Sequence, residues 1–453
     1  MKSINPVTEE LLKEYNDHSG VEVDTILKSM QQDWLSWRQT EFSERAEYMI
    51  RMAEILEDNT EKYSKLMTDE MGKTVIDGIS EIKKCAWACR YYAAKAEEFL
   101  TDELIETDRK KSYISYQPIG IVLAIMPWNF PFWQVIRQIA PSLMAGNGLA
   151  LKHASNVPGC ALAIEALVQE AGFPENIMRT LLVPGRETEP VINHPLVKAV
   201  AITGSTPAGR QVASTAGHAL KKTVLELGGS DPYIVLADAD LEFAAKTCAA
   251  SRLINAGQSC VAAKRFIVED SVYEEFSKLF VDAMRSAEWG DPNKSTTKVG
   301  PMARRDLRDE LHEQVVRTIS AGAQLLLGGE KPTGRGAYYP PTVLGGVRKG
   351  MPAYSEELFG PVATLIRASD EIDAIQIAND TVFGLGGAIF TKDVEKGERY
   401  ARNEIQSGVV AVNNMVMSDP RLPFGGIKES GYGRELSSVG IHEFVNIKTV
   451  TVD

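Results

Sequence analysis

The chain has 453 residues, of which 24% are charged, and a formal net charge of −12. Its length favours two domains over a single hydrophobic core, and its negative charge, offset by no basic block, disfavours nucleic acids and anionic membrane surfaces as partners. Five cysteines without zinc-ligand spacing, and no apolar run near the ~20 residues of a membrane span, argue against a secreted disulfide framework, a zinc finger and a membrane protein, so we expect a cytoplasmic protein with no resident metal.

The first hundred residues have a helical pattern. From about Val23 to Ala96, apolar side chains recur three and four positions apart, which predicts a helical scaffold. Cys85 and Cys89 share one face of a predicted helix, where two packing thiols are favoured over a strained disulfide. The segments KSYISYQ at 111–117 and VNIKTVTV at 445–452 alternate β-formers with polar residues, and such isolated strands invite pairing across subunits.

From Gly120 the pattern changes to short apolar strands that alternate with helices. This βαβ rhythm is typical of a parallel, doubly wound sheet. It resumes after Leu236 with a helix capped by an aspartate, and a second α/β stretch runs through Phe266 to Phe390. The sequence therefore predicts an α/β fold with a domain boundary near Gly228 and Gly229.

The segment Asn255-Ala-Gly-Gln-Ser-Cys260-Val places a cysteine after a glycine-containing turn. We expect Cys260 at the start of a helix, where backbone N–H groups lower the pKa of a thiol and can bind an oxyanion. A free thiol with a pKa of about 8.5 is only ~3% thiolate at pH 7, so this position favours a nucleophile. A lone loop cysteine is more often a packing residue, and the other motifs decide between the two.

Two further motifs carry polar groups that suit a cysteine nucleophile. Glu226, in TVLELGGSDP, ends a β-rich run beside two glycines, and burial there would give the raised pKa of a general base. The alternative is a solvated or ion-paired glutamate. In Pro127-Trp128-Asn129-Phe130-Pro131 the prolines hold the chain extended, which fixes the Asn129 amide as one half of an oxyanion hole. The alternative is an ordinary turn-forming asparagine.

The segment Gly204-Ser205-Thr-Pro-Ala-Gly209 follows the apolar strand AVAIT and precedes a helix. Arg210 and Gln211 stand where a P-loop has Lys-Ser/Thr, and no GxGxxG precedes them, so neither standard phosphate motif applies. A turn between a strand and a helix can still hold a pyrophosphate on helix N–H groups.

Seven short motifs of the chain resemble those of the aldehyde dehydrogenase superfamily and occur in that family's order. They are PWNFP, LKHAS, ITGSTPAG, LELGGSDP, GQSC, EELFGP and PFGGIKESGYGRE. The resemblance covers nearly the whole chain and implies two doubly wound parallel-sheet domains plus a small β arm for oligomerisation. It assigns residues 1–106 and 119–229 to a cofactor-binding domain, 230–428 to a catalytic domain, and 107–118 with 442–453 to the oligomerisation strands. By the same likeness the protein forms a homodimer or homotetramer.

The resemblance makes Cys260 the nucleophile, Glu226 the general base, and Asn129 with the Cys260 N–H the oxyanion hole, and it adds Lys152 to the catalytic set. Attack of the thiolate on an aldehyde gives a thiohemiacetal, whose hydride leaves for a nicotinamide cofactor. Glu226 then activates the water that hydrolyses the thioester. The product is a carboxylate, because relatives that pass the acyl group to coenzyme A typically lack this base.

The resemblance also implies a set of cofactor contacts. They are Trp128, Asn129, Lys152, His153, Ala154, Ser155, Gly204, Ser205, Leu227, Glu357 and Phe359. Ser155 departs from the NAD-preferring members, in which a glutamate holds the adenine ribose. That carboxylate, ~5 Å from a 2′-phosphate, would repel it by ~3 kcal/mol at an effective dielectric of ~20. We therefore expect NADP to be preferred and NAD to be accepted as well.

Within the family, three segments are most similar to those of bacterial succinate-semialdehyde dehydrogenases, namely LKHASNVPGCA, NAGQSCVAAKR and MSDPRLPFGG. Arg137, early in the helix that follows PWNFP, is expected to bind the substrate carboxylate, the alternative being a helix-surface residue. Ile254 stands where some of these enzymes carry a second substrate arginine, which makes Arg421 the candidate replacement. Gln134 and Phe424 complete the expected substrate site.

Three other functions are weighed against this one. A broad-specificity aliphatic aldehyde dehydrogenase would have the same nucleophile and no carboxylate recognition. A cofactor-independent thiol esterase would use Cys260 but leave the GSTPAG turn, Lys152 and Glu357 without a task. A non-catalytic protein of the same fold would have lost Cys260, Glu226 or Asn129, and all three are present.

Overall fold

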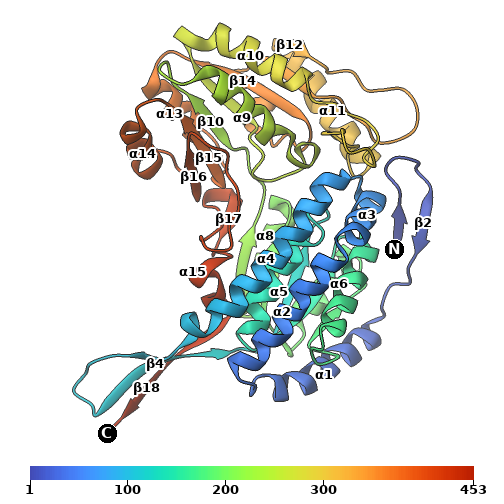
Figure 1. Cartoon of the computed structure of the whole chain (residues 1–453), viewed down its shortest axis with the longest axis vertical. Helices are drawn as coiled ribbons and strands as arrows, with labels where there is room; N and C mark the ends of the chain where they lie inside the picture. The colour runs from blue at the N-terminus through green and yellow to red at the C-terminus, as the bar shows by residue number, and fades with distance from the viewer.

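The computed structural model describes residues 1–453 and contains two large sheets, each covered by helices, and a projecting β arm (Figure 1). All neighbouring strands within each large sheet are parallel except one edge pair per sheet. The structure thereby confirms the predicted α/β class with two doubly wound parallel sheets. None of the helices is both long and apolar enough to cross a membrane.

The first sheet has six strands. In spatial order they are β17 (Gly431–Tyr432), β9 (Lys222–Glu226), β8 (Val197–Thr203), β5 (Ile121–Met126), β6 (Gly148–His153) and β7 (Met178–Thr180). The helices between them are α5 (Trp133–Met144), α6 (Pro158–Glu170), α7 (Thr188–Asn193) and α8 (Thr206–His218). Every residue of β5 is buried, as expected of a central strand covered on both faces. Because β5 lies between β6 and β8, the strand order reverses at its carboxyl end, which is where such sheets bind ligands.

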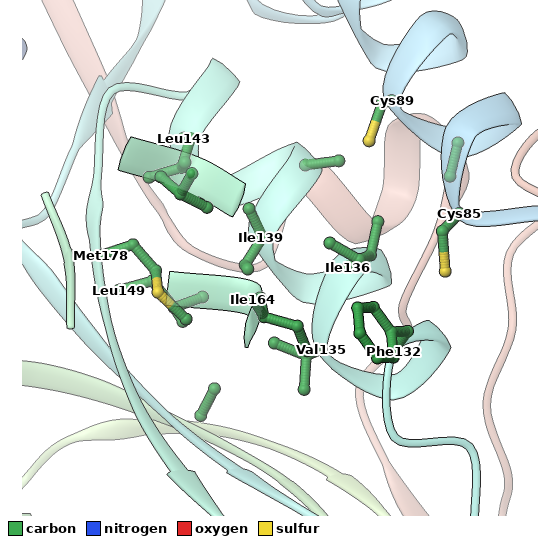
Figure 2. Packing of buried hydrophobic residues seen from close by; sticks show 14 of the residues in the cluster. Cys85, Cys89, Phe132, Val135, Ile136, Ile139, Leu143, Leu149, Ile164 and Met178 are labelled. Atoms are coloured by element: carbon green, nitrogen blue, oxygen red, sulfur yellow. The ribbon is translucent and has the colours of Figure 1, made fainter. Parts of the chain in front are cut away.

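Four helices precede this sheet. They are α1 (Gly20–Trp37), α2 (Phe42–Asp58), α3 (Thr60–Met71) and α4 (Val75–Leu100), so the predicted helical scaffold is confirmed. Of these, α2, α3 and α4 lie on the side of α5 and α6, and α1 packs on the opposite face with α7 and α8 (Figure 1). Ser19 and Glu22 form a capping box at the start of α1. Figure 2 shows Cys85 and Cys89 of α4 beside Ile136 of α5, and both thiols are free and fully buried. They are packing residues, and they fix α4 against the helix that follows PWNFP.

The second sheet has seven strands. In spatial order they are β12 (Gln324–Leu327), β13 (Thr342–Gly345), β14 (Val362–Ala368), β11 (Arg265–Glu269), β10 (Pro232–Val235), β15 (Gly386–Phe390) and β16 (Val409–Val412). Its helices are α9 (Leu241–Leu253), α10 (Tyr273–Arg285), α11 (Arg305–Ser320), α12 (Pro352–Ser355), α13 (Glu371–Asn379) and α14 (Val394–Asn403). The Asp240 side chain accepts a hydrogen bond from the Phe243 N–H, which confirms the aspartate cap of α9. After β16 the chain returns to the first sheet through β17 and α15 (Ser437–His442).

The β arm consists of β18 (Val445–Val452), β4 (Lys111–Pro118) and β3 (Glu103–Leu104), in that order. Both strands predicted at 111–117 and 445–452 are present. They pair with each other, antiparallel from Val445 opposite Pro118 to Val452 opposite Lys111, and pairing across subunits stays a prediction. The outer edge of β18 has no partner strand within the chain. A short N-terminal hairpin, β1 (Lys2–Ile4) and β2 (Leu11–Glu14), is a further element that the sequence pattern did not predict.

Candidate active site

A cavity of about 260 Å³ lies between the two sheets and is lined from both sides. Its lining consists of Pro127, Trp128, Asn129, Thr203, Gly204, Ser205, Leu227, Gly228, Cys260, Leu307, Glu357 and Phe359. The residues of the first sheet end or follow β5, β8 and β9 at their carboxyl ends, whereas Cys260 and Glu357 precede β11 and β14. The structure thus brings together Cys260, Asn129 and most of the nicotinamide-side residues that the sequence predicted.

Cys260 lies in a turn between the 3-10 helix η2 (Ile254–Gly257) and β11, so the expected helix start is wrong. The approach to it is unusual, because Asn255 and Ala256 have φ values of 52° and 54°, in the left-handed region. Burial raises the pKa of Cys260 to about 12, although the positive charges of Lys264 and Arg137 act in the opposite direction. The expected lowering of this pKa is also wrong, and the thiol must give its proton to a base when it attacks.

Lys264, which the sequence analysis missed, binds the backbone of the loop that carries Cys260. Its Nζ donates to the carbonyl oxygens of Ser259 at 2.8 Å and Cys260 at 2.7 Å, and lies 3.3 Å from Glu357 Oε1. The ammonium is almost completely buried, so these acceptors replace its water. One cation therefore fixes both the loop of the nucleophile and a predicted cofactor ligand.

The Asn129 amide is held by hydrogen bonds that join the two domains. Its Nδ2 donates to the Gln258 carbonyl oxygen at 3.1 Å, and Asn255 Nδ2 donates to the Asn129 carbonyl oxygen at 2.6 Å. These bonds orient the Asn129 NH₂ toward the nucleophile loop and leave one of its hydrogens unused. The Cys260 N–H also donates to no group of the chain. Both residues thus keep an N–H donor that no group of the chain uses, and their role as an oxyanion hole stays a prediction.

Glu226, at the carboxyl end of β9, is buried, and neither of its carboxylate oxygens accepts a hydrogen bond. Gly425 makes room for it, because a Cβ at that position would lie 2.7 Å from Glu226 Oε1. Burial raises the pKa of Glu226 well above its usual range, and the nearby charge of Glu435 raises it further, whereas Arg137 and Arg434 lower it. The environment therefore gives Glu226 the raised pKa that was expected of a buried carboxylate here.

Arg137 is only 2% exposed, so the alternative of a helix-surface residue is wrong. Its Nε lies 2.5 Å from Glu435 Oε2, its Nη2 donates to Thr203 Oγ1 at 3.1 Å, and its guanidinium lies over the Phe424 ring. Glu435 is a partner that the sequence analysis missed, because nothing in the local pattern links it to Arg137. Only one of the five guanidinium N–H donors, on Nη2, makes a hydrogen bond within the chain, since the Nε–Glu435 contact is an ion pair without hydrogen-bond geometry.

The other two predicted substrate residues differ in where they lie. Gln134 is buried on α5, and its Oε1 has no hydrogen-bond partner. Arg421, in contrast, is exposed, forms a two-pronged ion pair with Asp419 and lies over the Trp87 ring. Arg421 is thus a surface residue paired with a carboxylate, and its part in substrate binding stays a prediction.

Of the residues predicted for the adenosine and phosphate end, Gly204 and Ser205 line the Cys260 cavity, whereas Lys152 and Ser155 lie outside it. Lys152 lines a second cavity of about 210 Å³ with residues of α7 and α8, so its place fits cofactor binding rather than the chemical step. Ser155 lines a third, of about 770 Å³, together with Arg304 and Arg305. The His153 ring is buried, accepts the Ala154 N–H at Nδ1 and meets the Pro131 carbonyl with Nε2. Burial lowers the pKa of His153 to about 4, so a neutral side chain is committed to the scaffold.

The residues around the Cys260 cavity and the Lys152 cavity fit a dinucleotide. No side chain caps the amino end of α8, whose first N–H groups remain free for an anion. A Cβ on Gly228 would come within 2.7 Å of Glu357 Oε2, so glycine keeps that oxygen accessible. The other oxygen, Oε1, accepts the Gly229 N–H at 3.1 Å, which leaves Oε2 for a ligand hydroxyl. A thiol beside such a cleft is the arrangement of a dehydrogenase that works through a covalent cysteine intermediate.

The aldehyde dehydrogenase family model matches residues 1–450, and the chain belongs to this family. It is 49% identical over 450 residues to a probable succinate-semialdehyde dehydrogenase (NADP+) of Synechocystis sp., with 99% of each chain covered. It is 47% identical over 454 residues to the succinate-semialdehyde dehydrogenase (NADP+) of Mycobacterium avium, with 99% of this chain and 96% of that protein covered. The succinic semialdehyde dehydrogenase from Streptococcus pyogenes in complex with NADP+ matches with a TM-score of 0.97 and 38% identity, covering 100% of this chain and 99% of that one.

Proposed function

We propose that the protein oxidises succinate semialdehyde to succinate and uses NADP in preference to NAD. The observation that carries this proposal is Arg137, a buried cation whose charge acts on both Cys260 and Glu226. An aldehyde with a carboxylate at its far end complements the free donors of this guanidinium, whereas a simple aliphatic aldehyde leaves them without a ligand. The names of the relatives from Synechocystis and Mycobacterium avium support the same substrate.

In the proposed reaction Cys260 gives its thiol proton to solvent water and its sulfur attacks the aldehyde carbon, so that a carbon–sulfur bond forms and the carbonyl oxygen becomes an oxyanion. Asn129 Nδ2 and the Cys260 N–H donate hydrogen bonds to this oxygen. A nicotinamide cofactor, when bound beside this carbon, would supply the hydride acceptor that turns the thiohemiacetal into a thioester. Glu226 then takes a proton from the water that attacks the thioester, the carbon–sulfur bond breaks, and the acid leaves.

The cofactor is proposed to lie along the domain formed by residues 1–106 and 119–229. Lys152 and the amino end of α8 would hold its adenosine and phosphates, and Glu357 would bind the nicotinamide ribose. Ser155 supports the preference for NADP, because a hydroxyl next to the adenine ribose donates to a 2′-phosphate where a carboxylate would repel it.

A substrate panel with both cofactors tests the proposal. We expect kcat/KM for succinate semialdehyde to exceed that for butanal at least ~10-fold, and kcat/KM for NADP to exceed that for NAD. Equal values for the two aldehydes would favour the broad-specificity alternative. Aldehyde consumption or ester hydrolysis without any reduced cofactor would instead favour the thiol esterase.

We also propose that the β arm joins subunits into a homodimer or homotetramer. The free outer edge of β18 supports this proposal, because an unpaired strand edge is a ready surface for another chain, and Ile447 and Val452 are exposed along it. Light scattering on the purified protein tests it, and the mass of a single chain would contradict it.

A further inference from the structure

We infer that Lys84 is the second cation that recognises the carboxylate of the substrate, next to Arg137. This inference rests on the proposed function, because it identifies a residue that would give the enzyme its preference for a charged aldehyde. It assigns to α4, which the sequence pattern presents only as scaffold, a part in substrate selection.

Lys84 lies where three elements of the substrate side meet. Its Nζ donates to Ser418 Oγ at 2.7 Å and lies 4.5 Å from the centre of the Trp133 ring. Trp133 is one helical turn before Arg137 on α5, so the two side chains share a face of that helix. Ser418 belongs to the segment that leads to Phe424, and the Arg137 guanidinium lies 5.2 Å from the centre of the Phe424 ring. The same two elements therefore border both cations.

Arg137 is a charged neighbour of both the nucleophile and Lys84, since its positive charge acts on the pKa of each. An aldehyde bound at Cys260 would extend toward Arg137 and Lys84. A carboxylate at the far end of a short chain would then meet two cations.

Lys84 is a partly buried ammonium without an anion of its own. No carboxylate lies within 4 Å of its Nζ, because Asp419 pairs with Arg421 and Glu81 pairs with Lys73. Burial, assisted by the charge of Arg137, lowers the pKa of Lys84 to about 8. Burying a charge without a partner is costly, and a bound carboxylate would remove this cost. Ser418 uses one of the three ammonium donors, so two remain for the ligand.

Lys84 would also supply the second cation for the substrate carboxylate, which the sequence analysis does not find at Ile254 and expects at Arg421. Ile254 supplies no charge, and Arg421 is occupied by Asp419. Lys84 has the charge, the free donors and the position beside Arg137 that this task requires. Recognition by a lysine on α4 makes the specificity of the site depend on how α4 packs on α5.

The test compares Lys84→Met, which keeps the length of the side chain and removes its charge, with Lys83→Met, a matched change at an exposed position of the same helix. We expect Lys84→Met to lower the ratio of kcat/KM for succinate semialdehyde to that for butanal at least ~10-fold, mainly through KM, because a charged hydrogen bond is lost. Lys84→Arg should recover part of the ratio. Lys83→Met should keep the wild-type ratio.

A second measurement reads the carboxylate site without relying on the preferred substrate. Succinate should inhibit butanal oxidation in competition with the aldehyde, and its inhibition constant should rise at least ~10-fold in Lys84→Met. An unchanged constant, or an unchanged aldehyde ratio in an enzyme that prefers succinate semialdehyde, overturns the role of Lys84. A wild-type enzyme that does not distinguish the two aldehydes overturns the proposed function instead, and the succinate measurement then still decides on Lys84.

Discussion

Arg137 and Glu435 form an ion pair in which Nε and Oε2 are 2.5 Å apart and the side chains are only 2% and 3% exposed. Glu226 lies within the influence of both partners, since Glu435 raises its pKa and Arg137 lowers it. The buried pair therefore controls how readily the general base loses its proton. It also restrains the cation that is proposed to meet the substrate.

Glu435→Gln should move the acid limb of the kcat profile to lower pH. Glu226 works as a base only when deprotonated, so a raised pKa confines activity to higher pH. The substitution removes a neighbouring negative charge and frees the positive charge of Arg137, and both changes lower the pKa of Glu226. The measurement is kcat between about pH 5 and pH 9, normalised to its plateau. Exposed Glu404→Gln is the control, and a midpoint that stays or rises would contradict the assignment.

Glu226→Gln should separate the two halves of the reaction. Without a base for the attacking water, steady-state kcat should fall at least ~100-fold, while the first turnover still releases about one equivalent of reduced cofactor per site. Rapid mixing followed by mass spectrometry should find the acyl group on Cys260. Cys260→Ala should abolish both phases. Loss of the burst in Glu226→Gln would show instead that Glu226 is needed before the thioester forms.

Ser155→Glu should shift the cofactor preference toward NAD. A carboxylate ~5 Å from a 2′-phosphate costs ~3 kcal/mol at an effective dielectric of ~20, which corresponds to a loss of more than ~100-fold in kcat/KM for NADP. The value for NAD should change far less. Ser155→Ala, which adds no charge, is the matched control. Equal losses with both cofactors would mean that the substitution disturbs the fold around Ser155 and not the recognition of the phosphate.

Replacing Glu81 alone should lower the free energy of unfolding more than replacing Glu81 and Lys73 together. Glu81 Oε1 accepts the N–H groups of Phe132 and Trp133, both at 2.9 Å, and its Oε2 meets Lys73 Nζ at 2.5 Å in a fully buried pair. Glu81→Gln leaves the Lys73 charge unpaired and should lower the free energy of unfolding by ~3–5 kcal/mol. The double variant Glu81→Gln/Lys73→Met should recover much of this loss. Urea unfolding followed by circular dichroism measures both, and additive losses would exclude the pairing argument.

Much of the fold and the centre of the site could be predicted because their signals are local. Alternating and helical periodicities identified the strands and helices, and the motifs around Cys260 and Asn129 identified two groups that line one cavity, with Glu226 buried close enough for its charge to act on Cys260. The turn at Cys260 could not be predicted, because the left-handed Asn255 is held by hydrogen bonds to Asn129 and Gln258 that form only in the folded chain.

Partners that are distant in the chain were the main omission. Nothing in the sequence around Arg137 indicates Glu435, and helical periodicity shows that Lys84 shares a face with its neighbours on α4 without showing which element covers that face. The mutual pairing of β4 and β18 was missed for the same reason, since an alternating pattern predicts a strand and leaves its partner open.

The hydrogen bond between Asn129 and Gln258 spans the junction of the two sheets, and this gives catalysis a mechanical requirement of its own. A displacement of ~1 Å between reacting groups can cost ~100-fold in rate, although it leaves the interior of each domain untouched. The value of kcat therefore depends on how the two domains are aligned. Mild denaturant or heat should abolish activity before helical content is lost, and substitutions that stabilise the interface between the domains should extend the temperature range of activity more than substitutions inside either domain.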